Sequence, residues 1–183
     1  MGIYPTNQDG RVSIIPSVPL GRLNTEQARY LADVSNEWEG DLRLAPWRGV
    51  VLGTIPKSAA ANIVGHLRAR GLSCEGRDGF QGIAACAGIT GCDASLADVR
   101  GDAASLAQRL LGHAVPPGWT VNLSGCDKQC ARRHGATAEL IAGRSGYTLN
   151  IVSRGVASDC SREFALDAVA ALHENLLSEV AAG

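Results

Sequence analysis

The first residues of the chain show apolar spacing typical of a strand, followed by spacing typical of a helix. Branched apolar residues are frequent in residues 11–20, which predicts a strand, and two prolines in this segment place it near a sheet edge or mark the end of the strand. A helix is expected after Asn24, because Gln27 lies three residues later, as in a capping box, and apolar residues then recur at helical spacing. The chain is thus predicted to open with a strand and a helix.

Two more strands and a second helix are predicted next. Residues 41–44 and 49–55 are short strands on either side of a proline-containing turn, and residues 58–70 have the apolar spacing of a helix that ends at a glycine. The order strand, helix, strand, strand, helix is that of a ferredoxin-like unit, which needs a last strand at residues 72–76. Residues 1–80 are therefore interpreted as a ferredoxin-like half domain of βαββα type.

The remainder of the chain, residues 81–183, also combines strands and helices. The pattern predicts a helix over residues 93–111, a strand over residues 119–123 and a hairpin with a four-residue turn over residues 136–152. A last helix over residues 161–180 is expected to pack through apolar side chains spaced four positions apart: Phe164, Ala168, Leu172 and Leu176. The predicted fold class is α+β, with a second α+β module after the half domain.

Composition and charge exclude several classes of function. The chain has 183 residues, enough for a hydrophobic core, and 17 Lys and Arg against 18 Asp and Glu, so no net basic field favours nucleic acid. No apolar run approaches the ~18 residues of a membrane span, and the first residues show no signal-peptide pattern. A cytoplasmic protein without a nucleic-acid or membrane partner is therefore expected.

Six cysteines are unusual in such a protein, because a reducing compartment disfavours structural disulfides. Four of them form two close pairs in glycine-containing loops, Cys86 with Cys92 and Cys126 with Cys130. Such loops can curl around an inorganic group and offer N–H donors to its sulfur atoms, which favours an iron-sulfur cluster. Cys92 also precedes the predicted helix, whose N-terminus favours a thiolate. Zinc, which four thiolates also suit, and the absence of any metal are the alternatives.

The two cysteine loops resemble a known signature. Their sequences, ACAGITGC at residues 85–92 and SGCDKQCAR at residues 124–132, are similar to the two-part signature of the sirohaem-dependent nitrite and sulfite reductase superfamily. The segment LRLAPWRGVV at residues 42–51 resembles the ferredoxin-like half domain of the precorrin-3B synthases, the cobalamin branch of that superfamily. The resemblance covers roughly residues 2–155 and corresponds to the C-terminal half of the superfamily members only.

The resemblance implies that residues 81–183 form a module that binds a 4Fe-4S cluster. The implied metal ligands are the four paired cysteines, Cys86, Cys92, Cys126 and Cys130. Cys130 would also bridge to the iron of a tetrapyrrole, which is sirohaem or another haem-like iron centre. Cys74 and Cys160 lie outside the pairs and are expected to have no role in the cluster.

The resemblance also implies basic residues that contact the tetrapyrrole. Arg43 and Arg48 fall where the superfamily has arginines that bind tetrapyrrole carboxylates, and guanidinium groups suit this task because they form bidentate pairs. Lys128 and Arg132, at the second cysteine loop, are candidates for offsetting the negative charge of the cluster or contacting substrate. Without the resemblance, Arg43 and Arg48 would be interpreted as solvated charges, and Lys128 and Arg132 are equally consistent with an exposed turn. No catalytic residue is indicated.

The function implied by the resemblance is that of an oxidoreductase of cobalamin biosynthesis, a monooxygenase that converts precorrin-3A to precorrin-3B with dioxygen and a reductant. The cluster would relay electrons, and the arginines would orient the polycarboxylate tetrapyrrole substrate. Two alternatives stay open: half of a sirohaem-dependent sulfite or nitrite reductase, and a small iron-sulfur electron-transfer module. The expected partners are an electron donor, which the sequence does not indicate, and a complementary N-terminal half or a second copy of the chain.

Overall fold

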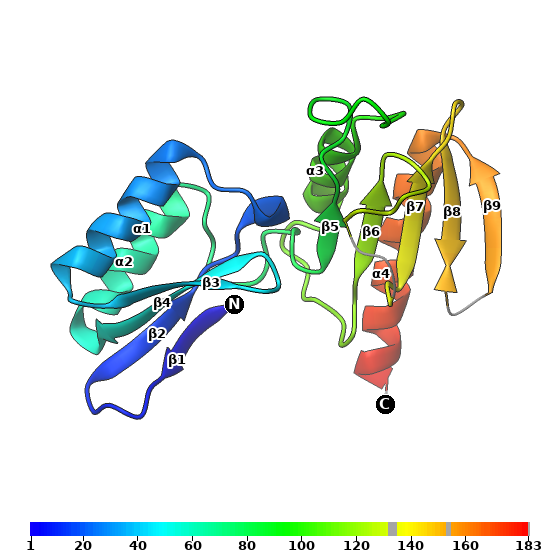
Figure 1. Cartoon of the computed structure of the whole chain (residues 1–183). Helices are drawn as coiled ribbons and strands as arrows, with labels where there is room; N and C mark the ends of the chain where they lie inside the picture. The colour runs from blue at the N-terminus through cyan, green and yellow to red at the C-terminus, as the bar shows by residue number, and fades with distance from the viewer. Residues whose placement is uncertain (132–134, 153–154, 183) are drawn as a thin grey trace. The chain divides into compact units, whose positions relative to one another are not determined.

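The computed structural model describes residues 1–131, 135–152 and 155–182, and the chain divides into two compact units, Met1–Gly76 and Arg77–Gly183 (Figure 1). Within the described residues, each unit has one β-sheet and two α-helices, so the predicted α+β fold class is confirmed. None of the helices in these ranges combines the length and the apolar composition that a membrane span requires.

The first unit is an antiparallel sheet with two α-helices packed on one face. The strands stand in the order β1 (Gly2–Pro5), β2 (Arg11–Ile15), β4 (Gly49–Pro56), β3 (Asp41–Ala45). The two α-helices are α1 (Thr25–Glu37) and α2 (Lys57–Ala69), and a short 3-10 helix, η1 (Pro19–Gly21), precedes α1. The predicted capping box is confirmed at the start of α1. The Asn24 side chain accepts a hydrogen bond from the Gln27 backbone N–H (2.8 Å), and the Gln27 side chain accepts one from the Asn24 N–H (2.9 Å).

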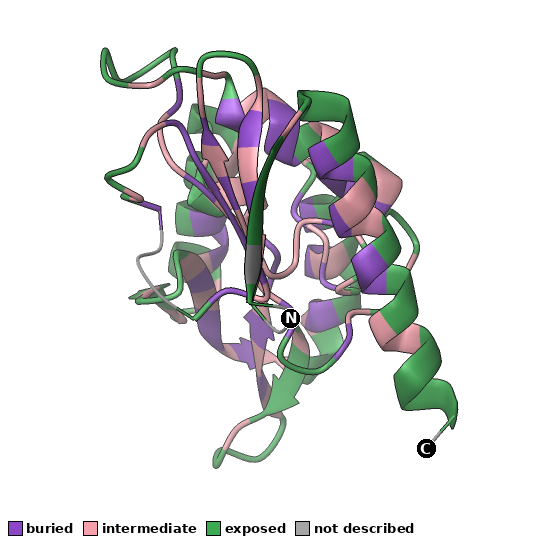
Figure 2. Cartoon of the chain, turned by 90° about the vertical axis from the view of Figure 1, so that its right-hand side faces the viewer, coloured by how far each residue is buried: buried purple, intermediate pink, exposed green. Residues whose placement is uncertain are grey.

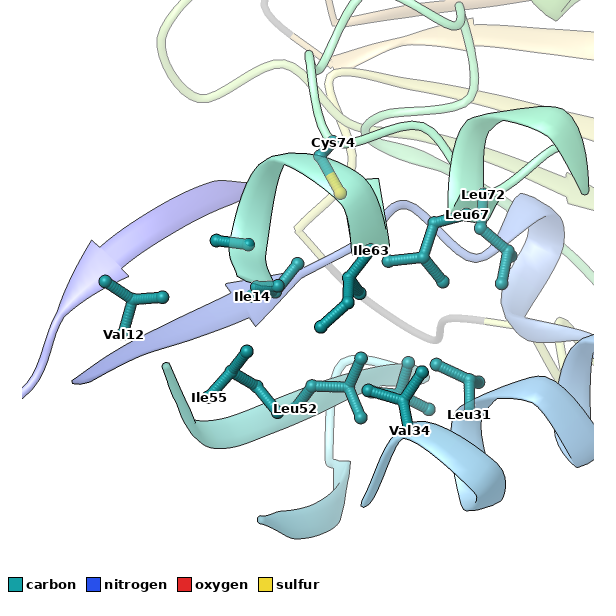
Figure 3. Close-up of a cluster of buried hydrophobic side chains, with 12 residues drawn as sticks. Val12, Ile14, Leu31, Val34, Leu52, Ile55, Ile63, Leu67, Leu72 and Cys74 are labelled. Atoms are coloured by element: carbon teal, nitrogen blue, oxygen red, sulfur yellow. The ribbon is translucent and has the colours of Figure 1, made fainter. Parts of the chain in front are cut away.

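Apolar side chains from the sheet and from both helices form one core in this unit. Figure 3 shows Ile14 and Leu52 from the sheet pointing toward Leu31 of α1 and Leu67 of α2. All four side chains have no exposed surface. Burying each of them contributes roughly 1.5–3 kcal/mol of hydrophobic stabilisation. The half domain is therefore held together mainly by this apolar layer between sheet and helices.

A β-bulge explains why the inward positions of β4 do not strictly alternate. Leu52 and Ile55 are both buried although they lie three residues apart, because the pairing with β2 shifts and Thr54 has a φ of 53°. The guanidinium of Arg11 donates hydrogen bonds from Nη1 to the carbonyl oxygens of Thr54 (2.6 Å) and Trp38 (3.3 Å). The Arg11 side chain thus supplies hydrogen-bond donors to backbone carbonyl groups at the irregular point of the strand.

The predicted strand at residues 72–76 is wrong. The backbone there is irregular, and the carbonyl of Ser73 accepts a hydrogen bond from the Ser17 N–H (2.7 Å). The fourth strand of the sheet is instead β1, which pairs antiparallel with β2. Leu72 and Cys74 are buried in the core, so the apolar character of this segment reflects packing rather than strand pairing.

The second unit has a mixed sheet whose strands follow their order in the sequence. These are β5 (Ile83–Ala85), β6 (Val121–Ser124), β7 (Ala138–Ala142), β8 (Tyr147–Ile151) and β9 (Val156–Cys160), with helices α3 (Val99–Arg109) and α4 (Arg162–Ala182). The first three strands are parallel, and the last three are antiparallel. The predicted hairpin is confirmed as β7 and β8, whereas β5 and β9 were not expected.

Helix α4 is confirmed, and of the four side chains predicted on its buried face Leu172 is buried, Ala168 and Leu176 are half-buried and Phe164 is exposed. Phe164 is 60% exposed, whereas Leu166 and Val169 are fully buried and Leu172 is 7% exposed. In Figure 2 the helix that ends at the label C has buried positions along its first half and exposed positions in its last turns. The buried stripe combines spacings of three and four residues. A prediction based on a strict four-residue spacing therefore included the exposed Phe164 and missed the buried Leu166 and Val169.

Helix α3 begins later than the predicted start at residue 93. Its first residue is Val99, and Asp98 caps it by accepting a hydrogen bond from the Gly101 N–H (3.2 Å). Residues 93–98 form turns and bends. Cys92 is therefore separated from the helix by six residues, and the expectation that the N-terminus of this helix favours its thiolate is wrong.

Asp102 of α3 is a buried charge that joins three elements of the second unit. It is 4% exposed and accepts hydrogen bonds from the Tyr147 hydroxyl of β8 and from Nε of Arg162 in α4. Burial, followed by the contact with Asp102, raises the pKa of Tyr147 well above its ordinary value of 10.0. Tyr147 therefore stays a hydrogen-bond donor, and the packing of the two helices on the sheet includes a charged group with satisfied partners.

Candidate functional site

The two cysteine loops begin at the carboxyl ends of neighbouring parallel strands. Cys86 directly follows β5, and Cys126 lies two residues after β6. The register pairs Ala85 with Leu123, so both strands end at the same edge of the sheet. Polar and ligand-binding groups often gather at such an edge because consecutive loops converge there.

Three hydrogen bonds connect the segment that carries Cys86 with the end of β6 and with the second loop. The N–H of Cys86 donates to the carbonyl of Leu123 (3.2 Å), and the N–H of Gly125 donates to the Sγ of Cys86 (3.2 Å). The carbonyl of Gly125 in turn accepts a hydrogen bond from the N–H of Leu96 (2.7 Å). The segments that carry Cys86 and Cys126 are therefore held side by side by backbone contacts.

The four predicted ligands are free thiols in two different environments. Cys86 and Cys126 are half-buried, whereas Cys92 and Cys130 are exposed. Cys130 follows Gln129, a non-glycine residue with a φ of 48°, so the second loop turns sharply just before this thiol. In the described part of the chain, no three Cys, His, Asp or Glu side chains come together in an arrangement that could hold a metal ion. The structure brings the two loops together without assembling the four thiols.

The donor chemistry of these loops fits a group ligated by thiolates. Four thiols lie on adjoining loops, and one sulfur already accepts a hydrogen bond from a backbone N–H, which stabilises negative charge on sulfur. Ser124 adds a hydroxyl that is 1% exposed and has no hydrogen-bond partner among the described residues. A buried donor without a partner next to Cys126 is consistent with a polar or charged group at this edge.

The two remaining cysteines lie in environments that keep them protonated. Cys74 is buried in the core of the first unit, and burial raises the pKa of its thiol to about 11. Burial also raises the pKa of Cys160, whose Sγ donates to the carbonyl of Tyr147 (3.5 Å). Metal ligation requires the thiolate, so neither residue is a candidate ligand.

Arg43 and Arg48 belong to the first unit. Arg43 lies on β3 opposite Val51 of β4, on the sheet face away from the helices, and it forms an ion pair with Asp41. Arg48 is exposed in the turn between these strands and has a φ of 60°, and its N–H donates to the carbonyl of Ala45 (3.0 Å). Both side chains reach solvent, as binding of an external carboxylate requires.

Arg43 also borders a polar hollow in the surface of the first unit. The hollow measures about 410 Å³ and contains Asp41, Ser13 and Gly53 in its lining. A Cβ atom at Gly53 would lie 1.8 Å from Oδ1 of Asp41, so a larger residue there would require the Asp41 carboxylate to move. This oxygen has no hydrogen-bond partner among the described residues. Arg43 is thus held by a carboxylate in a concave, solvent-accessible place.

The basic residues near the second cysteine loop are only partly defined. Lys128 is exposed, two residues after Cys126. Arg132 lies outside the described residues, so its predicted role is untested. Residues that the sequence did not single out are Gly125 and Ser95, which make the closest contact between the loops. The sequence signal for them was only their position near cysteines, since Gly125 directly precedes Cys126 and Ser95 lies three residues after Cys92. Contacts between distant loops leave no periodic pattern.

The comparison with protein families identifies the first unit. Residues 4–70 match the family described as the nitrite/sulfite reductase ferredoxin-like half domain. This part of the chain is similar to that half-domain family. The match ends before the cysteine loops of the second unit, so it supports the half-domain prediction and does not itself test the metal ligands.

Curated proteins extend the similarity into the second unit. The chain is 35% identical over 127 residues to a precorrin-3B synthase of Sinorhizobium sp, a match of 67% of this chain and 26% of that protein. It is 25% identical over 134 residues to a ferredoxin–nitrite reductase of Synechococcus elongatus, covering 72% of this chain and 26% of that protein. The matched part thus amounts to about a quarter of these relatives, and the chain is homologous to part of these oxidoreductases.

A solved structure supports the fold assignment. The structure of the Mycobacterium tuberculosis NirA protein matches 82% of this chain and 30% of its own length, with a TM-score of 0.68 and 24% sequence identity. The likeness confirms a ferredoxin-like half domain followed by a mixed-sheet α+β module.

Proposed function

We propose that this chain is the cluster-bearing half of an oxidoreductase that converts precorrin-3A to precorrin-3B with dioxygen. The observation that carries the proposal is the pair of cysteine loops at the ends of the parallel strands β5 and β6, joined by backbone hydrogen bonds. The identity of 35% to a precorrin-3B synthase supports the choice of reaction within the family. The chain would act in cobalamin biosynthesis.

Cys86, Cys92, Cys126 and Cys130 are the residues proposed to hold a 4Fe-4S cluster, with Cys130 as the bridge to a tetrapyrrole iron. A bound cluster of this kind supplies one-electron transfer. The backbone N–H of Gly125 donates to the Cys86 sulfur, as N–H donors do to the sulfur atoms that hold a cluster. The buried Ser124 hydroxyl offers a second donor beside Cys126.

Arg43 and Arg48 are proposed to orient the carboxylates of the tetrapyrrole substrate. The exposed guanidinium of Arg43 can exchange its contact with Asp41 for a substrate carboxylate, because an exposed ion pair contributes little stability. Before substrate binds, the hydrogen bond that Nε of Arg43 donates to Asp41 holds the guanidinium in place. Lys128 and Arg132 are the corresponding candidates at the second cysteine loop.

The partners are a tetrapyrrole substrate, an electron donor and the missing part of the site. The chain spans about a quarter of the length of its curated relatives, so the complete activity is proposed to need a complementary half or a second copy of this chain.

The second candidate function is that of half of a sirohaem-dependent nitrite or sulfite reductase. It is favoured by the family of the first unit and by the identity of 29% over 119 residues to a sulfite reductase of Mycolicibacterium paratuberculosis, which covers 61% of this chain and 21% of that protein. The same thiols would then hold the cluster beside sirohaem, and the basic residues would face a small anion.

Incubation with precorrin-3A, dioxygen and a reductant separates the two candidates. The chain is tested after anaerobic purification, alone and with the N-terminal half of the precorrin-3B synthase relative. A product with one added oxygen atom, detected by mass spectrometry, is expected in the second sample. A sirohaem absorption spectrum together with sulfite or nitrite reduction and no oxygenated product would contradict the proposal and support the reductase.

A further inference from the structure

Ser95 and Gly125 make an unusually close contact between the two cysteine loops. A Cβ atom placed on Gly125 would lie 1.9 Å from Oγ of Ser95, 2.8 Å from its Cβ and 3.3 Å from its Cα. Real Cβ contacts essentially never fall below 3.0 Å. The space beside the Gly125 Cα is therefore filled by the Ser95 side chain, and no larger residue fits at position 125 without movement of a loop.

The backbone of Gly125 does not itself require glycine. Gly125 is absent from the residues of positive φ, so an alanine could adopt its conformation. The constraint is the contact with the other loop. This differs from Gly88 of the first cysteine loop, whose φ of 68° favours glycine because of the backbone alone.

Ser95 cannot rotate away without loss. Its Oγ donates a hydrogen bond to the carbonyl of Ala97 (2.9 Å), and its N–H donates to the carbonyl of Cys92 (3.0 Å). Even another rotamer would leave the Ser95 Cβ too close to a new Cβ at position 125. Ser95 is thus fixed within the first loop, and Gly125 must approach it from the second.

Gly125 also carries two of the hydrogen bonds between the loops. Its N–H donates to the Cys86 Sγ, and its carbonyl accepts from Leu96, the residue after Ser95. Displacing Gly125 would therefore move the next residue, Cys126, away from Cys86. Gly125 therefore couples its steric contact with Ser95 to the spacing of the Cys86 and Cys126 thiols.

We propose that Ser95 and Gly125 are positioning residues that set the distance between the Cys86 loop and the Cys126 loop. The consequence for the cluster rests on the proposed function. The contact itself, however, can be tested in the protein without iron. Changing Gly125 should separate the loops, and removing the Ser95 side chain should then restore their approach.

The test compares four proteins: the unaltered full chain, Gly125→Ala, Ser95→Ala with Gly125→Ala, and Ser95→Gly with Gly125→Ala. Alkylation of Cys86 by iodoacetamide is followed in the iron-free proteins by mass spectrometry of its peptide. Gly125→Ala should raise the alkylation rate by about tenfold, because overpacking opens the contact. The change to Ala at position 95 should restore the rate in part, and the change to Gly should restore it to within about twofold.

Gly91→Ala is the matched control, because it lies in the first cysteine loop and a Cβ there meets only Ala87 of the same loop, at 3.3 Å from its Cβ and 3.9 Å from its carbonyl oxygen. Its Cys86 rate should equal that of the unaltered chain. Alkylation of Cys160, in the same unit, shows whether Gly125→Ala unfolds the unit as a whole. If the alkylation rates of Cys86 and Cys160 both rise in Gly125→Ala, the proposal still requires that adding Ser95→Gly restore the Cys86 rate. An unchanged Cys86 rate in Gly125→Ala, or a failure of the Ser95→Gly change to restore it, would overturn the proposal.

Iron content after anaerobic reconstitution gives the second readout. It should fall severalfold in Gly125→Ala and recover when Ser95 is changed to Gly. Undiminished iron uptake by Gly125→Ala would overturn the positioning role. If the unaltered chain takes up no iron, the proposed cluster fails, while the alkylation series still decides whether the two residues position the loops.

Discussion

The two units of this chain use buried polar groups differently. Five polar or charged side chains are buried among the described residues, and four of them, Asp102, Asn122, Ser124 and His173, belong to the second unit. The first unit buries Ser17 alone within these ranges and relies on the apolar core of Figure 3. The candidate binding residue of this unit, Arg43, lies on its exposed surface, outside the apolar core. The cysteine loops instead extend from a unit that also buries polar side chains, among which Asp102 has hydrogen-bond partners and the Ser124 hydroxyl has none among the described residues.

Truncating the core of the first unit should have the largest effect on stability. Leu52→Ala removes a side chain with no exposed surface and leaves a cavity, so the free energy of unfolding should fall by about 3 kcal/mol. Urea denaturation followed by circular dichroism measures this change. Leu44→Ala, at an 85% exposed position on β3, is the control and should change it by less than about 0.5 kcal/mol. Equal effects of the two substitutions would contradict the assigned core.

Removing the buried carboxylate of the second unit should have the next largest effect. Asp102→Ala leaves the Tyr147 hydroxyl without its acceptor and removes the contact between Asp102 and Nε of Arg162, which should cost about 2 kcal/mol. Asp159→Asn, at an exposed position of β9, is the control for loss of one carboxylate. Urea denaturation that gave the same midpoint for Asp102→Ala and the unaltered chain would show that the apolar contacts alone hold this unit.

The buried histidine of the second unit should make its stability depend on pH. His173 is 1% exposed and packs against Trp119 (ring centroids 4.7 Å apart) and His113 (6.1 Å), and burial followed by the nearby His113 lowers the pKa of His173 below 6.5. The unfolded chain therefore binds the proton more readily, and the free energy of unfolding falls as the pH drops below 6.5.

Urea denaturation at about pH 7.5 and about pH 5.5 measures this dependence. His173→Gln should reduce the difference between the two conditions. His66→Gln, at an exposed position of α2 in the first unit, should leave it unchanged. A pH dependence that is identical in all three proteins would assign the effect to other groups.

Loss of Arg43 should have the smallest effect on stability and a larger one on ligand binding. Its ion pair with Asp41 is exposed, so Arg43→Ala should lower the free energy of unfolding by less than about 0.5 kcal/mol. Binding of a tetrapyrrole polycarboxylate, measured by fluorescence titration, should weaken by about tenfold. Arg68→Ala removes a similarly exposed ion pair with Glu75 and should not affect binding. Equal affinities of both variants would exclude Arg43 from the site.

Local signals predicted most of the helices and the regular strands. The capping box at Asn24 and the hairpin of β7 and β8 depend on residues close in the sequence, and both were found where expected. Short strands such as β5, with three residues, carry too few positions for alternation to be visible. The bulge at Thr54 and the buried face of α4 depend on partners distant in the sequence, which no local pattern shows.

The candidate site was predicted at the level of residue types only. The cysteine pairs in glycine-containing loops were evident from spacing, and the family of the first unit agrees with the resemblance. The joining of the loops through Leu96 and Gly125 requires the parallel pairing of β5 and β6, which could not be expected while β5 itself was unrecognised. The roles of the four cysteines, Arg43, Arg48, Lys128 and Arg132 stay predictions.

The proposed cluster is tested most directly by iron and acid-labile sulfide analysis of the anaerobically reconstituted full chain, together with electron paramagnetic resonance after reduction. The unaltered chain and Cys160→Ser should contain about four irons and about four sulfides and give the signal of a reduced cluster. Cys86→Ser and Cys126→Ser should lose most of both. A chain without iron and sulfide, or Cys86→Ser and Cys126→Ser variants that keep the full signal, would contradict the proposal that these two loops hold a cluster.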